Sequence, residues 1–133
     1  MINFKILTLF PELFPGPLAA SVTGLALQKK LWNLEVANIR NYATDERKTV
    51  DDTPYGGGAG MVLKPDVIAA AIEDNSVVNQ KIIYLSPRGK KFNQKMARQL
   101  AGEKNITLLC GRYEGVDQRV LDEFQIEEIS IGD

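Results

Sequence analysis

Short apolar runs alternate along the chain with segments in which apolar side chains recur every three or four positions. The runs have the length of buried strands, and the recurring positions have the spacing of one helix face. The pattern predicts strands at residues 4–10, 34–39, 82–85, 106–110 and 126–131. It predicts helices over residues 17–31, from Pro65 onward, after Asn93, and along the stripe Val116, Val120, Leu121 and Phe124.

Alternating strands and helices favour parallel strands joined by right-handed crossovers. The strand at 82–85 is apolar on both faces, as a buried parallel sheet requires. There are no repeats and no linker. We therefore expect one α/β domain over residues 1–133, a parallel sheet with helices on both faces.

The composition is that of an ordinary globular protein, with 44% hydrophobic and 25% charged residues in 133. No apolar run approaches the roughly 20 residues of a membrane span, and the first residues do not resemble a signal peptide. The single cysteine, Cys110, fits a reducing compartment. We expect a cytoplasmic protein without a membrane partner.

Two features of the composition narrow the chemistry. The chain has no histidine, which excludes Ser-His and Cys-His nucleophile pairs within it and zinc sites built on several His and Cys ligands. Its net charge of −1 excludes a uniformly basic nucleic-acid-binding protein. Carboxylates, Arg, Lys, Tyr, backbone dipoles or a cofactor must supply the chemistry, and any nucleic-acid contact must come from a local patch.

Open parallel sheets bind ligands beyond the carboxyl ends of their strands. Four segments should project there: residues 40–60, Ser86 to Gly89, Cys110 to Gly115, and Ile131 to Asp133. Ser86 to Gly89 could equally be a plain turn with proline at its second position. In Gly111 to Gly115, two glycines flank Arg112, Tyr113 and Glu114, which offer a stacking surface and an acceptor for hydroxyls or a cation. The alternative is a strand-to-helix turn with solvated charges.

The glycine run at 56–60 matches neither a phosphate-binding P-loop nor a Rossmann fingerprint. Four glycines in five residues favour a flap, and the flanking Asp51, Asp52 and Tyr55 are either turn formers or groups that meet a substrate. Cys110 is expected to be a small buried residue, since no histidine can activate it.

Cations crowd the region after the third predicted strand: Arg88, Lys90, Lys91, Lys95 and Arg98. Three more, Arg40, Arg47 and Lys48, lie in the long loop. Such clusters usually form a solvated face. Because these lie beside the expected ligand end, contact with a phosphate backbone is an equal alternative.

Several motifs closely resemble one family along the whole chain. They are FPELF at 10–14, VTG at 22–24, TVDD at 49–52, PYGGG at 54–58, GM at 60–61, YLSP at 84–87, CGRYEGVD at 110–117 and SIGD at 130–133. The chain resembles the bacterial tRNA (guanine-N1)-methyltransferases of the SPOUT, or α/β-knot, superfamily.

The resemblance implies methyl transfer from S-adenosyl-L-methionine to N1 of the guanine at tRNA position 37, by a homodimer with a trefoil knot in each subunit. It implies that cofactor-binding residues come from three segments: Tyr84, Leu85, Ser86 and Pro87; Gly111, Tyr113, Glu114 and Gly115; and Ile131 and Gly132. It further implies that Asp51, Gly58 and Gly60 approach the substrate.

Family members continue past Asp133 with the rest of the knot and a tRNA-binding domain, and the family's aspartate general base and its arginine lie there. No residue here inherits those roles. Glu114, as a ligand of Mg2+, and Arg112, in positioning, are the candidates for supporting roles. We expect little or no activity from these 133 residues alone. The alternatives are a form that binds cofactor or tRNA without catalysis, and a nucleotide-dependent enzyme of another α/β superfamily.

Overall fold

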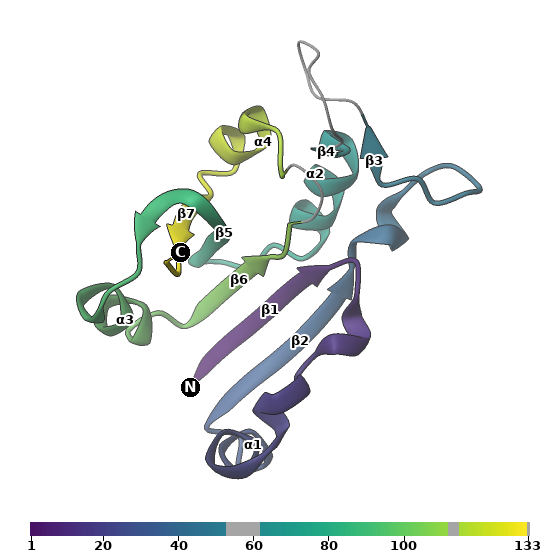
Figure 1. Ribbon diagram of the computed structural model, residues 1–133. Helices are drawn as coiled ribbons and strands as arrows, with labels where there is room; N and C mark the ends of the chain where they lie inside the picture. Colours follow the sequence, from purple (N-terminus) through teal and green to yellow (C-terminus); the bar gives the residue numbers. More distant parts are fainter. Residues whose placement is uncertain (53–61, 112–114, 133) are drawn as a thin grey trace.

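The computed structural model describes residues 1–52, 62–111 and 115–132. Its main sheet has five parallel strands in the order β2-β1-β6-β5-β7 (Figure 1). The strands are β1 (Ile2–Thr8), β2 (Trp32–Asn38), β5 (Gln80–Lys91), β6 (Asn105–Leu109) and β7 (Glu127–Ser130). A separate antiparallel pair consists of β3 (Asp51–Asp52) and β4 (Val62–Leu63).

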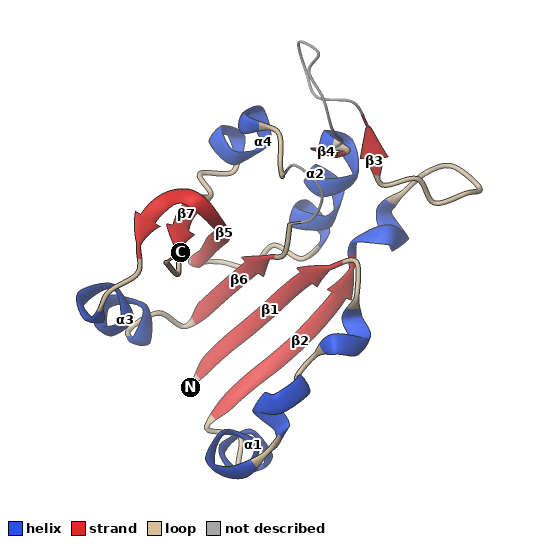
Figure 2. Ribbon diagram, in the orientation of Figure 1, coloured by secondary structure: helices blue, strands red, loops and turns tan. Residues whose placement is uncertain are grey.

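Within the described residues, four α-helices and three 3-10 helices connect the strands (Figure 2). The α-helices are α1 (Ser21–Gln28), α2 (Pro65–Asp74), α3 (Gln94–Ala101) and α4 (Gln118–Glu123). The 3-10 helices are η1 (Pro11–Leu13), η2 (Gly16–Ala19) and η3 (Ile39–Tyr42). No helix in the described part of the chain is long and apolar enough to cross a membrane.

Helices cover both faces of the sheet, as β5 shows. Ile82 and Tyr84 belong to the large core cluster, together with buried side chains of α2 and α4. Ile83, which points to the opposite face, belongs to a second cluster against which Met96 and Leu100 of α3 pack. The predicted fold class is therefore confirmed.

Local signals for helix starts are also confirmed. Pro65 is the first residue of α2. The side chain of Asn93 caps α3 by accepting a hydrogen bond from the Met96 amide at 2.9 Å. The prediction for the fourth helix was wrong at its start, because Val116 pairs with Leu63 in an isolated bridge and Asp117 is the N-cap.

The predicted helix over 17–31 is two elements, η2 and α1. The chain turns at their junction, where Ala20 is extended and Ser21, the first residue of α1, has a φ of 57°. A non-glycine residue with positive φ ends a regular helix locally. The predicted loop after residue 40 also contains structure, since η3 and β3 both lie in it.

The largest difference from the sequence prediction concerns β5, which continues to Lys91. Leu85 and Lys90 both pair with Ile129 of β7, so the four residues between them bulge from the ladder. The turn predicted at Ser86 to Gly89 is therefore a bulge within one bent strand. After the bulge, β5 curves around β7 and leads into α3 (Figure 1).

Gly89 makes this bend possible. A Cβ atom at this position would lie 2.4 Å from the carbonyl carbon of Glu128 and 2.5 Å from the nitrogen of Ile129. Backbone atoms cannot rotate away as a side chain can. The bulge therefore requires a residue without a Cβ.

Candidate functional site

The segments expected to bind a ligand lie on neighbouring strands. Strand β5 lies between β6 and β7, and Tyr84 pairs with Leu109 on one side and with Glu128 on the other. The ends of these strands therefore carry the loop at Gly111, the bulge at Ser86 and the terminal Ile131 and Gly132 to one part of the sheet edge. We call Tyr84, Gly111, Gly115 and Glu128 the Tyr84 cluster.

The Tyr84 ring lies directly against two glycines of the loop between β6 and α4. A Cβ at Gly111 would lie 2.5 Å from Cε1 of Tyr84, and one at Gly115 would lie 3.1 Å from its hydroxyl oxygen. Gly115 also has a φ of 119°, which side chains disfavour. Both glycines are thus needed for their backbone to lie this close to the ring.

Tyr84 is held neutral in this setting. It is buried, and desolvation raises the pKa of its hydroxyl. The negative charge of Glu128 raises that pKa further, while Arg88 lowers it in part. Its hydroxyl can therefore donate or accept a hydrogen bond, but it is not suited to act as a base near neutral pH.

Glu128 is a site residue that the sequence reasoning missed. Its Oε2 atom is buried and has no hydrogen-bond partner among the described residues. A buried carboxylate oxygen without a donor is costly, on the order of 1–3 kcal/mol. Alternation along β7 could have placed Glu128 on the face opposite the buried Ile129, but not beside Tyr84, because that position depends on the pairing of β7 with β5.

The other predicted cofactor residues of β5 and β7 lie around this cluster. Ser86 is buried, and its hydroxyl accepts a hydrogen bond from the Arg88 amide at 3.2 Å. Pro87 is exposed. Leu85 of β5 is 47% exposed and Ile131, directly after β7, is 76% exposed, so both apolar side chains face solvent. The Gly132 amide donates to the Ser130 hydroxyl at 3.2 Å.

Among the remaining candidate residues, the structure describes Asp51 and Cys110 but not the others. Asp51 pairs with Leu63, whose amide donates to the Gly115 carbonyl at 3.2 Å, so β3 and β4 join the site through Gly115. The other candidates lie outside the described residues: Gly58, Gly60, Arg112, Tyr113 and Glu114. Cys110 is partly buried, and burial raises the pKa of its thiol, as expected for an unactivated cysteine.

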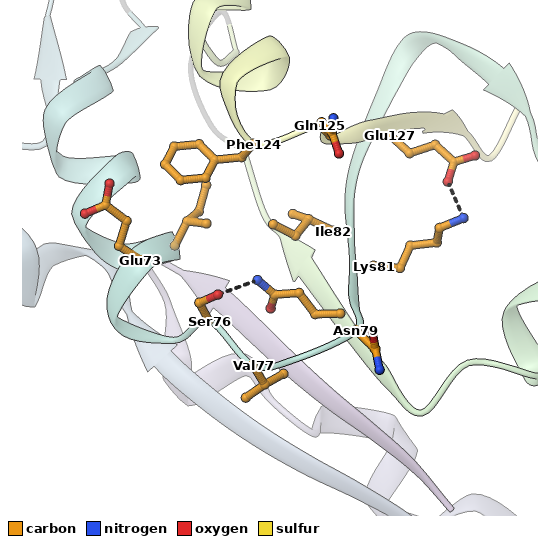
Figure 3. Close-up of a pocket in the computed structure, with 11 residues that line it drawn as sticks. Glu73, Ser76, Val77, Asn79, Lys81, Ile82, Phe124, Gln125 and Glu127 are labelled. Carbon is orange, nitrogen blue, oxygen red and sulfur yellow. Dashed lines mark hydrogen bonds and ion pairs between the residues drawn. The ribbon is translucent and has the colours of Figure 1, made fainter.

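Two cavities bear on the location of a ligand. One of about 200 Å³ lies at the carboxyl ends of β1 and β6 and includes Thr8, Phe10 and Gly111 in its lining. A cleft of about 810 Å³ lies at the opposite edge of the sheet, where β5 and β7 begin (Figure 3). Lys81 and Glu127 form an ion pair there at 3.4 Å, and Gln80 donates to Ser76. Within residues 1–52, 62–111 and 115–132, no three acidic or thiol side chains are grouped to hold a metal.

The five-stranded parallel sheet with helices on both faces defines an α/β domain, and the Tyr84 cluster is its candidate ligand site, beside the carboxyl ends of the strands where such sheets bind ligands. The comparisons with known proteins identify the family. A model described as tRNA (Guanine-1)-methyltransferase TrmD matches residues 2–133, and the chain belongs to this family.

Curated relatives agree along the same length. A tRNA (guanine-N(1)-)-methyltransferase of Ehrlichia canis (strain Jake) is 55% identical over 134 residues, covering 99% of this chain and 57% of the relative. The protein of the same name in Ehrlichia ruminantium (strain Gardel) is 57% identical over 135 residues, which cover 100% of this chain and 57% of the relative. The protein of the same name in Pelagibacter ubique (strain HTCC1062) is 53% identical over 133 residues, which cover 100% of this chain and 58% of the relative.

The chain thus spans somewhat more than half the length of these relatives. The family resemblance inferred from the motifs is confirmed. The alternative of a nucleotide-dependent enzyme from another α/β superfamily is wrong.

Proposed function

We propose that the chain is the S-adenosyl-L-methionine-binding domain of an enzyme that methylates N1 of the guanine at tRNA position 37. The observation that carries this proposal is the family match over residues 2–133, which includes every strand-end segment around the Tyr84 cluster. The printed names of the relatives give tRNA as their substrate and guanine N1 as the methylated atom.

The described residues fit the proposed cofactor. S-adenosyl-L-methionine carries positive charge, a flat adenine ring and several hydrogen-bond donors. Glu128 offers a buried acceptor without a donor, and Leu85 and Ile131 offer exposed apolar surface nearby. We propose that these residues hold the cofactor together with Tyr84, Ser86, Pro87, Gly111, Gly115 and Gly132, and that Tyr113 and Glu114 contribute from the same loop.

The cofactor supplies a methyl group that is already electrophilic, so the protein's main task is to align donor and acceptor. The neutral Tyr84 and the glycines against it would provide a fixed wall for this purpose. Guanine N1 carries a proton that a base must accept. We propose that this base lies in the part of the longer relatives that this chain does not span.

Charge that develops on guanine O6 is best met by a cation. We propose Arg112, or Mg2+ held by Glu114, for this role. The matched test is Glu114→Gln in the active enzyme: Mg2+-dependent turnover should fall, and turnover with unchanged dependence on Mg2+ would reject the ion-binding role.

We also propose the assembly that the family implies: a homodimer with a trefoil knot, acting in the cytoplasm where tRNA is used. Support for a dimer comes from exposed apolar side chains on two consecutive elements, since Leu18 of η2 is 48% exposed and Val22 and Leu25 of α1 are 78% and 52% exposed. Exposed apolar side chains that gather in one region often mark an interface.

The test combines binding and transfer. Calorimetry should detect S-adenosyl-L-methionine binding to the chain, weakened at least tenfold by Gly111→Ala, whose Cβ would displace Tyr84, and unchanged by Gly102→Ala, whose nearest neighbour would lie at 3.5 Å. In a protein extended to the full length of the relatives, methyl incorporation should require guanine at position 37 of the tRNA. A folded chain with no affinity for the cofactor would refute the proposal, and cofactor binding without incorporation by the extended protein would favour the non-catalytic alternative.

A further inference from the structure

One segment of the chain has strongly segregated charge. From Lys81 to Gly102 there are six cations and no acidic residue. The whole chain has 16 cations and 17 acids, so the remaining residues hold ten cations against 17 acids. The segment therefore stands out as positive on a molecule that is otherwise negative.

Five of these cations lie in the bulge of β5, in the strand beyond it and on α3, and we call them the α3 cationic face: Arg88, Lys90, Lys91, Lys95 and Arg98. All five are exposed, and none forms an ion pair with another residue that the structure describes. The sixth, Lys81, lies at the other end of β5, paired with Glu127.

The packing of α3 fixes the direction of this face. Met96 and Leu100 pack against the sheet, while Lys95 and Arg98 are exposed. Residues three apart on a helix are neighbours on its surface, so Lys95 and Arg98 present adjacent charges. Phe92 lies between the strand and helix cations in sequence and is 43% exposed, which adds a ring able to stack on a base.

Two observations separate this face from an ordinary solvated surface. Soluble surfaces usually mix charges of both signs, and the segment from Lys81 to Gly102 has no acidic residue. The face also begins at the candidate site, because the Arg88 amide donates to the Ser86 hydroxyl at 3.2 Å and the charge of Arg88 lowers the pKa of the Tyr84 hydroxyl. A guanine held at that site belongs to a strand with one phosphate per nucleotide on either side.

We propose that the α3 cationic face binds the phosphate backbone of the RNA whose guanine enters the site beside Tyr84. This inference rests on the proposed function for the identity of the guanine. The contact with the backbone is electrostatic and independent of sequence. The bend of β5 joins the face to the site along the chain, since it carries the backbone from Tyr84 around β7 to α3 (Figure 1).

The test uses Lys95→Gln/Arg98→Gln, which removes two exposed charges and keeps good helix formers. The control is Lys29→Gln/Lys30→Gln, which removes two exposed charges near the end of α1. The probe is a fluorescent RNA hairpin of anticodon stem-loop size with guanine 3′ of the anticodon. Its affinity is measured by anisotropy at several salt concentrations, and calorimetry measures cofactor binding to each variant.

Each phosphate contact contributes about 0.7 to 0.9 to the slope of log affinity against log salt. Loss of two contacts should reduce the magnitude of the slope by about 1.5 and weaken binding roughly 10- to 30-fold near 0.15 M salt. The control should stay within about twofold of the unchanged protein, and cofactor affinity should be the same in all three.

RNA affinity and salt slope that are equal in the α3 variant and the control would overturn the proposal. So would loss of binding to phosphatidylserine vesicles in the α3 variant with RNA affinity intact, because the face would then recognise a membrane. Failure of the proposed function has a different signature: no cofactor binding by any variant, with the RNA defect of the α3 variant still present.

Discussion

Replacement of Gly89 by alanine tests the bend of β5. The added Cβ would lie 2.4 to 2.5 Å from three backbone atoms of Glu128 and Ile129, whereas ordinary contacts begin at 3.4 Å. The two strands would have to separate by about 1 Å, and because the obstacle is backbone, no rotamer change relieves it.

Separation of β5 from β7 at Gly89 would disrupt the hydrogen bonds between these strands beyond the bulge. There Lys90 pairs with Ile129, Lys91 pairs with Ser130, and the Phe92 amide donates to the Ser130 carbonyl at 2.7 Å. Loss of two or three backbone hydrogen bonds at about 0.5–1.5 kcal/mol each predicts a decrease of about 1–4.5 kcal/mol in the free energy of unfolding. The Phe92 amide should also exchange with solvent faster.

Urea unfolding measures the change. The single tryptophan, Trp32, packs edge-on against Phe4 of β1 and reports on the sheet by fluorescence. The control is Gly102→Ala, where the Cβ meets only the Gln99 carbonyl oxygen at 3.5 Å and φ is −83°. An unfolding free energy for Gly89→Ala within about 0.5 kcal/mol of the control, the usual range for neutral substitutions, would refute the steric argument.

Three further predictions concern single side chains. Asn93→Ala should lower the free energy of unfolding by about 1 kcal/mol through loss of the α3 cap, while Gln99→Ala on the exposed side of the same helix should not; equal effects in urea melts would exclude the capping role. Glu128→Gln should lower the pKa of Tyr84, since the negative charge that raises it is removed, and desolvation should still keep it above 10.0; an unchanged ultraviolet titration would show that the two side chains do not interact. The Thr49 hydroxyl and amide hold the pKa of Asp45 below its ordinary 3.8, so the stability it contributes is present above that pH and is lost as pH falls through the folded-state value. Thr49→Val should raise the NMR-measured pKa of Asp45, and an unchanged value would assign the shift elsewhere.

Features determined by nearby residues were predictable from the sequence. The start of α2 at Pro65 and the cap of α3 at Asn93 each depend on a few adjacent positions. The fold class followed from the alternation of elements, because parallel strands require crossovers. The true start of α4 was also predictable from nearby residues, although Val116 was wrongly placed in the helix. Asp117, directly before Gln118, is a typical N-cap residue.

Features determined by distant contacts were not predictable. The bulge in β5 depends on Gly89 meeting Glu128, a contact that no local pattern encodes. The same is true of Tyr84, whose neighbours Gly111 and Gly115 come from another loop. The strand-end rule predicted that these segments would be neighbours, but the role of Glu128 required knowing which residue it pairs with across the strands.

The four residues of β7 pair with β5 both before and after its bulge. A contact that stabilises β7 therefore also stabilises the segment leading into α3, because the Phe92 amide donates a hydrogen bond to the Ser130 carbonyl. A small molecule that binds to Glu128 would, through this hydrogen bond, reduce local opening of the positively charged helix α3 without contacting it. Amide exchange in α3 should slow when such a molecule binds.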